Sequence, residues 1–172
     1  VAHRGDRAVM PDLCAAREAF AATMAAIAAD GASAADLGLP TDLGVSDGEP
    51  ARMPQAAVWT DVCPTALTTS VDATCHRARV SWEIVAYAMV TRATREQAVS
   101  DCHAAVSLAA CAALANPTLG RRVNSCAPRV DAMGCAPNDD RRWSCAAEVH
   151  VACTVADAAP PKSVTTLMKG KI

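Results

Sequence analysis

The chain has few aromatic residues and little net charge. Aromatic side chains make up 3% of its 172 residues, and the formal net charge is -2 at pH 7. This charge provides no basic field for nucleic acid, so we expect no specific nucleic-acid partner. Much of the 52% apolar share is alanine, so that share overstates the bulk of the core. At this length we expect one domain with appended segments.

Signals for membrane insertion and export are also lacking. No stretch approaches the roughly 20 consecutive apolar residues of a membrane span. The first segment, VAHRGDRAVM, is charged and has no apolar region before a small-residue cleavage site. We therefore expect a soluble protein that is made in the cytoplasm and has no membrane partner.

The common catalytic and cofactor motifs are missing from the sequence. There is no G-x-S-x-G, P-loop, dinucleotide-binding glycine pattern or H-E-x-x-H. His150 and Glu148 lie two residues apart on one strand face and can touch, but a solvated strand face explains them better than an acid–base pair. The charged run NDDRR (residues 138–142) is explained better by a hairpin tip than by a metal or phosphate site. We predict no catalytic residue, no cofactor and no metal.

The nine cysteines are a high and odd number. There is no C-x-x-C motif, and the adjacent Cys75 and His76 have no partner pair, which argues against a zinc site. Cys145 and Cys153 fall on the apolar face of a predicted strand, where cysteine packs as a small hydrophobic residue. We expect most of the thiols to be packing residues. Cys63 and Cys75 bracket a predicted loop and are the one candidate disulfide.

Two long stretches alternate between apolar and other residues, as strands do. RRWSCAAEVHVACTV (residues 141–155) predicts a half-buried strand. HRARVSWEIVAYAMV (76–90) predicts a second strand, whose later part is apolar on both faces because Tyr87 and Met89 join the second face. We expect that end of the strand to be covered by a helix or by another subunit.

Two shorter strands and a connection complete the predicted sheet. QAAVWTDV (55–62) predicts a strand, and the Thr/Ser-rich residues 63–75 predict a connection with room for a short strand. Residues 121–133 predict a less regular strand, in which Pro128 favours a sheet edge or a bulge. This strand should form a hairpin with residues 141–155.

Two helices are predicted. Residues 11–29 carry an apolar stripe, with Asp12 at the positive end of the helix dipole and a stop at Asp30. A capping box that begins at Thr94 starts the second helix, which stops at Asn116 before a proline. The expected buried stripe of the second helix is Val99, Cys102, Val106, Ala110 and Ala113.

The element order predicts an α+β domain: a mostly antiparallel sheet with two helices packed on one face. We assign this domain to residues 1–155. Within it, residues 32–54 are rich in Gly, Pro, Asp and Ser and predict a long loop or arm that becomes ordered against a neighbour. Residues 156–172 predict an extended C-terminal tail.

Two arginine pairs flank the predicted hairpin, one at its base and one at its tip. Arginine is enriched at protein interfaces. The later part of the 76–90 strand is apolar on both faces, so we expect another element or subunit to pack against it. The candidate subunit or partner contacts are therefore Arg121, Arg122, Arg141, Arg142, Tyr87 and Met89.

The sequence resembles the tail-terminator proteins of long-tailed bacteriophages and related phage-derived particles. The resemblance covers roughly residues 11–155. It lies in the order and character of an N-terminal helix followed by MPQAAVWT, ARVSWEIVAYAMV, TREQAVSDCHAAVSLAACAALANPTLG and RRWSCAAEVHVACTV. The passage from the long strand through the helix into NPTLGRRV carries most of it. The 32–54 segment, the cysteine content and the tail go beyond the compact pattern of that family.

The resemblance implies a structural virion protein without enzymatic activity. Its subunits would form a six-fold ring on the head-proximal end of the tail tube. The ring would stop tube polymerisation and dock to the connector of the head. The implied partners are further copies of the chain, the tail tube protein and a head-completion or connector protein, and the implied location is the tail or neck of the virion.

Other functions stay open at the level of sequence. In the same class are head-closure or neck, minor tail and capsid-decoration proteins, which differ in their position in the particle. In another class are a small thiol-dependent enzyme and a metal-binding module, for which a reactive, exposed cysteine or a bound metal would be the sign. A monomeric α+β domain with an unknown ligand is the third alternative.

Overall fold

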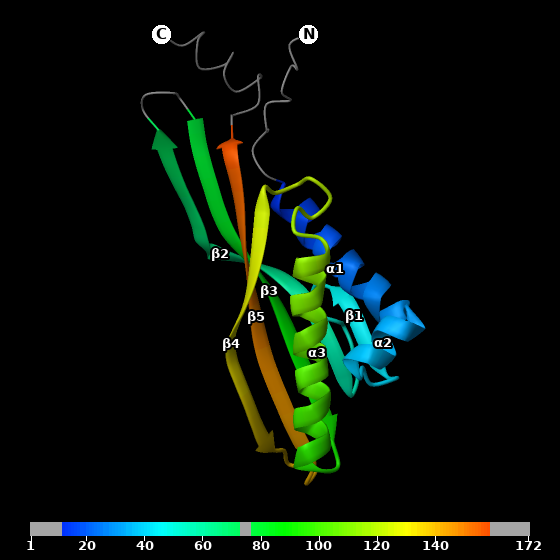
Figure 1. Cartoon of the computed structure of the whole chain (residues 1–172). Helices are drawn as coiled ribbons and strands as arrows, with labels where there is room; N and C mark the ends of the chain where they lie inside the picture. Colours follow the sequence, from blue (N-terminus) through cyan, green and yellow to red (C-terminus); the bar gives the residue numbers. More distant parts are fainter. Residues whose placement is uncertain (1–11, 73–76, 159–172) are drawn as a thin grey trace.

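The computed structural model describes residues 12–72 and 77–158. Their elements are α1 (Leu13–Ala29), α2 (Gly31–Leu37), β1 (Leu43–Asp47), β2 (Ala56–Asp72), β3 (Arg77–Arg92), α3 (Arg95–Ala115), β4 (Ser125–Pro137) and β5 (Trp143–Ala158). The strands form one sheet in the order β1-β2-β3-β5-β4 (Figure 1). Every neighbouring pair is antiparallel except β1 and β2, which are parallel. The predicted α+β class with a mostly antiparallel sheet is confirmed.

The prediction of a long loop over residues 32–54 is wrong, because α2 and β1 lie in this segment. The Asp30 carboxylate accepts hydrogen bonds from the backbone N of Ser33 at 3.0 Å and from its hydroxyl at 2.6 Å, which caps the start of α2. Gly38, with φ 64°, ends α2 in the left-handed conformation that glycine adopts without strain. The described part of the chain thus has a third helix, and the segment is part of the domain.

The connection predicted for residues 63–75 is also largely wrong. β2 continues across most of it, with a register irregularity between Cys63 and Thr68. Cys75 and the side chain of Cys63 lie outside the described part of the chain, and so does the candidate disulfide between them. Of the predicted 156–172 tail, the first residues extend β5, and the rest lies outside the described residues.

The predicted helix ends are confirmed by their capping contacts. Asp12 caps α1 through its side chain, which accepts a hydrogen bond from the backbone N of Ala15 at 3.0 Å. Thr94 caps α3 in the same way, with the backbone N of Gln97 at 3.3 Å as the donor. Asn116 caps the other end of α3. These contacts satisfy backbone groups that a helix terminus otherwise leaves without partners.

The predicted hairpin is confirmed as β4 and β5, which pair antiparallel. β4 is an edge strand of the sheet. It contains Pro128 and a register irregularity between Val130 and Ala132. The proline had predicted an edge or a bulge, and the strand has both.

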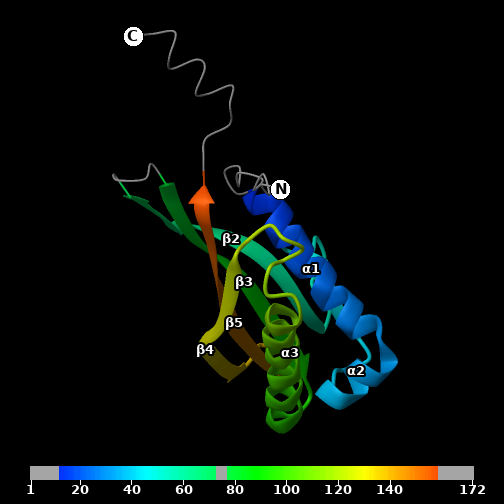
Figure 2. The ribbon, with the colours of Figure 1, turned by 45° about the horizontal axis from the view of Figure 1, so that its top comes forward.

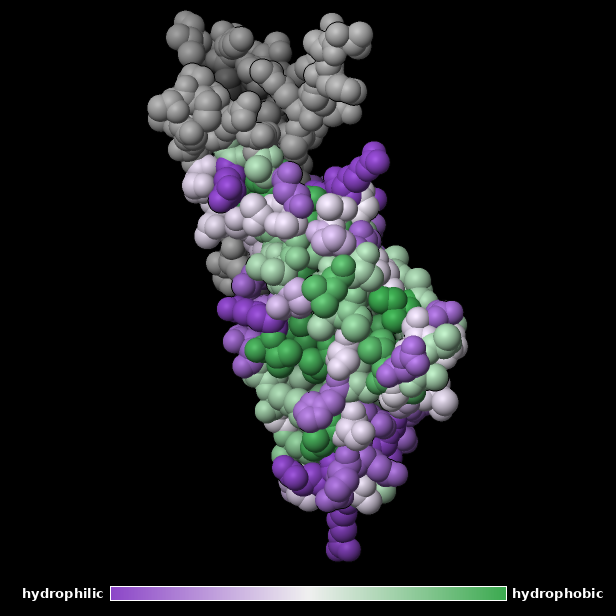
Figure 3. Space-filling model, in the orientation of Figure 1, coloured by the Kyte–Doolittle hydropathy of each residue, from purple (hydrophilic) through white to green (hydrophobic). Residues whose placement is uncertain are grey.

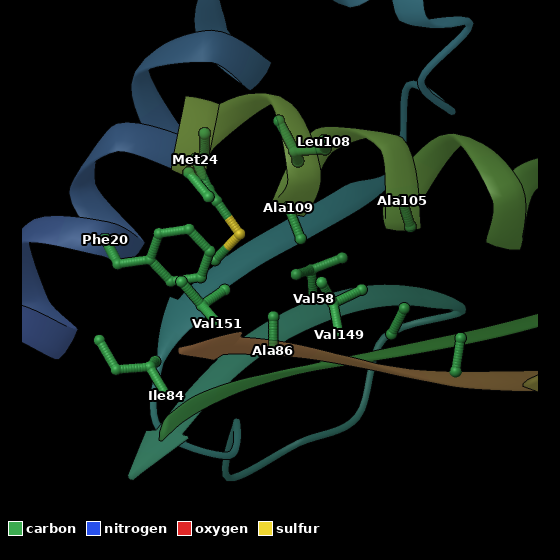
Figure 4. Packing of buried hydrophobic residues seen from close by; sticks show 14 of the residues in the cluster. Phe20, Met24, Val58, Ile84, Ala86, Ala105, Leu108, Ala109, Val149 and Val151 are labelled. Atoms are coloured by element: carbon green, nitrogen blue, oxygen red, sulfur yellow. The ribbon is translucent and has the colours of Figure 1, made fainter. Parts of the chain in front are cut away.

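The core lies between the helices and the sheet. Phe20 and Met24 of α1 point toward strand side chains (Figure 4), and Leu108 of α3 is buried in the same cluster. Figure 2 shows α1 running over β1 and β2 and α3 running beside β3, β4 and β5. The strand residues of the core cluster all share one face of the sheet. The main ones are Ala56, Val58, Val80, Trp82, Ile84, Ala86, Val90, Cys145, Val149, Val151 and Cys153.

α3 faces the sheet with a stripe that differs from the predicted one. Cys102 and Ala113 are fully buried as predicted, but Val99, Val106 and Ala110 are only half-buried. Ala105 and Ala109, which were not predicted, are buried. Because alanines occur on several faces of this helix, its sequence does not show which face turns toward the sheet. The structure turns the smallest side chains toward the sheet, which lets the helix approach closely.

α3 is, among the described residues, the one helix that is long and apolar enough to cross a membrane by length and composition, with a hydropathy of 1.5. The expectation that no stretch approaches a span is therefore wrong for this helix. Within the most apolar 18-residue stretch of this helix, 44% of the residues are buried in the structure. Its buried Cys102, Ala105 and Ala109 belong to the core cluster, as is typical of a core helix.

Arg92, at the end of β3, joins the sheet to two other elements. Its Nε donates to Asp101 of α3 at 2.7 Å, and its Nη1 and Nη2 donate to the two carboxylate oxygens of Asp42 at 2.9 and 2.6 Å. Such a two-pronged arrangement is the stronger form of ion pair. The hydrogen bond from Arg92 holds the pKa of Asp42 below its ordinary value.

We predict that replacing Ala105 by Leu destabilises the domain. The larger side chain has no room between α3 and the sheet, and overpacking of this kind costs about 1–3 kcal/mol. The free energy of unfolding, measured by chemical denaturation, should fall by this amount. Ser107→Leu, at an exposed position of the same helix, should change it by less than about 0.5 kcal/mol. Equal effects of the two substitutions would contradict close packing of α3.

We also predict that Asp42→Asn lowers the free energy of unfolding at pH 7 and that the loss disappears in acid. Because the folded-state pKa of Asp42 is depressed, its stabilising effect is present above the unfolded-state pKa and is lost as the pH falls through the folded-state pKa. Denaturation of both proteins across acidic pH measures the difference. Asp36→Asn, at an exposed position of α2, is the control and should leave the stability at pH 7 unchanged.

Candidate functional site

The face of the sheet opposite the core carries an open, mostly apolar hollow of about 330 Å³. We call it the sheet-face hollow. It is lined mainly by Trp59, Tyr87, Met89, Gly134, Ala146 and Glu148. The rings of Trp59 and Tyr87 are stacked, with centroids 5.5 Å apart and an angle of 24° between their planes. Tyr87 and Met89, predicted as contact residues, therefore lie on one surface.

The register of the strands explains why this hollow forms. Trp59 of β2 is opposite Tyr87 of β3, which is opposite Glu148 of β5. Further along, Met89 is opposite Ala146, which in turn is opposite Gly134 of the edge strand β4. The large side chains of Trp59, Tyr87 and Met89 on β2 and β3 thus project further from the sheet than Ala146 of β5 and Gly134 of β4. The hollow is the space above these two small residues.

A charged cluster adjoins the hollow on the same face. His150 of β5 has its Nδ1 2.8 Å from Glu83 Oε2, and its Nε2 3.4 Å from Glu148 Oε2 and 3.5 Å from Asp131 Oδ2. Arg129 Nη2 lies 3.3 Å from the other Glu83 oxygen. The side chains of His150 and Glu83 are 13% and 22% exposed, whereas that of Arg129 is 57% exposed. The inner pair is therefore held in place, and the outer members are accessible to a partner.

Sequence reasoning found only part of this cluster. The predicted contact of His150 with Glu148 is present, but at 3.4 Å it is longer than the 2.8 Å contact with Glu83. Glu83, Arg129 and Asp131 come from neighbouring strands, so only the strand register places them here. Within the described ranges, no group of three or more His, Cys, Asp or Glu side chains has the geometry to hold a metal ion.

The four arginines proposed as contacts do not form one surface. Arg121 and Arg122 are exposed in the loop between α3 and β4, and Arg141 is exposed in the turn between β4 and β5. Arg142 is half-buried and donates from Nη2 to Gln55 Oε1 at 3.2 Å. The loop and the turn lie at opposite ends of β4 (Figure 1). Its 13 residues separate them by roughly 40 Å at the usual rise of a strand.

A second set of apolar side chains is exposed on the helix side of the sheet. It consists of Val130 and Met133 of β4, whose side chains are 54% and 38% exposed. We call it the helix-side patch. Val130 is opposite Val149 and Met133 is opposite Ala147, so both strand residues share the core face. Figure 3 shows apolar side chains gathered over the middle of this side, where α1, α3 and β4 lie in Figure 1.

In comparisons with known proteins, no protein-family model matches the chain, and no curated protein matches it significantly. The function is therefore inferred from the two surfaces of the domain and from the resemblance of its sequence.

We predict that Glu83 organises the charged cluster. Glu83→Ala removes the 2.8 Å contact of His150 and the ion pair with Arg129, and should lower the free energy of unfolding by about 1–2 kcal/mol. Glu148→Ala removes a longer contact of a side chain that is 45% exposed, and should cost less than about 0.5 kcal/mol. Urea denaturation of both variants at pH 7 measures the difference. A larger loss for Glu148→Ala would show that the cluster is organised differently.

Proposed function

We propose that the chain is a structural virion protein whose subunits form a ring that caps the tail tube and joins it to the head connector. One observation carries the ring: the sheet-face hollow and the helix-side patch are two different apolar surfaces on opposite sides of one sheet. A two-fold dimer uses the same patch on both subunits, whereas a ring joins one patch of each subunit to a different patch of the next. Two unlike surfaces per subunit are what a ring requires.

The arrangement of the helices supports this assembly. In the proposed subunit, α1 and α3 form the layer on one face of the sheet and leave the other face for a neighbour. Trp59, Tyr87 and Met89 are then the anchors of the contact, since buried aromatic side chains and methionine are enriched at interfaces. The exposed Arg129 and Asp131 stand at the rim, where charges set the orientation of a partner.

The length of the strands supports a role as part of a tube. β2, β3 and β5 continue past the end of α3 (Figure 1). The 16 residues of β5 span roughly 50 Å at the usual rise of a strand. A sheet of this height can form the wall of a ring that continues a tube. The exposed Arg141, in the turn between β4 and β5, would then lie near one rim of this wall, whereas Arg121 and Arg122, in the loop that follows α3, would lie short of the other rim.

The sequence resemblance supports the tail terminator among the structural proteins of a virion, and with it the six-fold symmetry. A head-closure or neck, minor tail or capsid-decoration protein is the nearest alternative. Electron microscopy of a particle that carries a label on this chain separates these assignments, because each predicts a different position along the particle.

We predict that the chain assembles into rings, alone or when tube ends are supplied. Light scattering and negative-stain microscopy should show them. Met89→Asp, in the hollow, and Met133→Asp, in the helix-side patch, should each weaken assembly at least about ten-fold, since each places a charge in an apolar contact. An equimolar mixture of the two variants should form dimers only, because one intact hollow and one intact patch remain.

Ala25→Asp, at an exposed position of α1, is the matched control and should assemble normally. Circular dichroism must show that all three variants are folded. A monomer that stays monomeric in the presence of tube ends would contradict the proposed function. Rings that form unchanged from both methionine variants would refute the two surfaces but leave the ring itself intact.

A further inference from the structure

Four cysteines of the described chain form two pairs across the β4–β5 hairpin. Cys126 is directly opposite Cys153, and Cys135 is directly opposite Cys145. Residues opposite each other on antiparallel strands have Cα atoms about 4.5–5.5 Å apart. Disulfides usually join Cα atoms about 4.4–6.8 Å apart. Each pair therefore stands at a separation that a disulfide spans without movement of the backbone.

The irregularity in β4 is what brings the second pair together. The two cysteines of β4 are nine positions apart (135 − 126), and those of β5 are eight apart (153 − 145). An odd spacing places two residues of a regular strand on opposite faces, and an even spacing places them on the same face. The extra residue between Val130 and Ala132 corrects this mismatch, so all four thiols lie on the core side.

We propose that this hairpin is an oxidation site, at which two cross-strand disulfides fasten the edge strand β4 to β5. None of the four is joined in a disulfide in the structure described here. The proposal does not depend on the function proposed above.

Exposure and acidity give the order of the reaction. Cys126 and Cys135 are half-buried, whereas Cys145 and Cys153 are buried. Burial raises the pKa of Cys145 and of Cys153 to about 12. Because the thiolate is the attacking species, the buried thiols do not begin the reaction. A soluble disulfide therefore meets the half-buried thiols of β4 first.

Each closure is a thiol–disulfide exchange with a small disulfide, RSSR. The Cys135 thiolate attacks one sulfur of RSSR, which forms a mixed disulfide and releases RS⁻. Cys145 then loses its proton and attacks the Cys135 sulfur, which releases the second RS⁻. In total, two protein thiols are oxidised to one disulfide, RSSR is reduced to two RSH, and the two thiol protons go to these products. Cys126 and Cys153 react in the same way.

Cys102 of α3 is the competing partner of Cys145. A hydrogen bond between their side chains contributes to the raised pKa of Cys145. Cys102, however, is fully buried beneath its helix, so a soluble disulfide does not form a mixed disulfide with it. The half-buried Cys135 is thus the partner that captures Cys145.

Peptide mapping tests the two links. The full chain is incubated with glutathione disulfide, its free thiols are alkylated in denaturant, and it is digested with trypsin without reduction. Cleavage after Arg129 separates Cys126 (peptide 123–129) from Cys135 (peptide 130–141), while both β5 cysteines stay on peptide 143–162. Two cross-strand disulfides give a species of three linked peptides. Cleavage after Glu148 then separates the β5 cysteines and should yield 130–141 linked to 143–148.

Cys135→Ser should lose peptide 130–141 from the linked species and keep the link of Cys126 to Cys153. Cys111→Ser, on α3, is the matched control and should leave the three-peptide species unchanged. Oxidation should also slow hydrogen exchange of β4 amides roughly ten- to a hundred-fold, because the edge strand no longer opens independently.

Two outcomes would overturn the proposal. One is a link between Cys145 and Cys102. The other is complete alkylation of all four hairpin cysteines after oxidation, under conditions in which the exposed Cys14 has formed its mixed disulfide with glutathione.

Discussion

The close approach of α3 to the sheet is the constraint on which the rest of the structure depends. The chain has only one phenylalanine, one tyrosine and three tryptophans, so its core cannot be filled by large rings. It is filled instead by bringing the layers together. Ala105 and Ala109 of α3 belong to one buried cluster with Ala86 and Val149 of the sheet, and all four are at most 1% exposed. Dispersion gained over many short contacts replaces the area that a few large side chains would bury.

The same use of small residues shapes the other face of the sheet. Opposite the core, Ala132, Gly134 and Ala146 are short, whereas Trp59 and Tyr87 are tall, and a hollow results. In the core an alanine faces a helix that fits against it. In the hollow no described element fills the space, and the apolar floor stays open. An exposed apolar surface of this kind is typical of an interaction site, where a second apolar surface would remove it from water.

The fold could be predicted from the sequence where the determining contacts are local. The alternation in residues 141–155 and the caps at Asp12 and Thr94 depend on neighbours within a few positions, and each was confirmed. The parallel strand β1 was missed because its partner lies across a loop and its own five residues are too few to show a period. The rotation of α3 was missed because alanine on every side leaves no distinct stripe.

The candidate site was predictable only in part, for the same reason. Tyr87 and Met89 stood out because their strand is apolar on both faces. Trp59 did not, because its place beside Tyr87 follows from the register of two strands. The pairing of Cys135 with Cys145 needs one step more. It depends on the extra residue in β4, which moves the later residues of the strand to the other face of the sheet. Pro128 is the sequence signal for such an irregularity, but a proline does not show at which residue the irregularity occurs.

The edges of the sheet bear on how the subunits of the proposed ring would meet. Edge strands usually offer free backbone groups to another chain. β1, however, has only five residues. β4 carries Pro128, which has no N–H to donate, and a register irregularity that interrupts a regular ladder. Both edges are thus poor templates for a continuous sheet between subunits. The faces are not protected in this way. In the proposed ring, contacts between subunits would therefore form through side chains on the two faces, where apolar area and charge can specify one orientation.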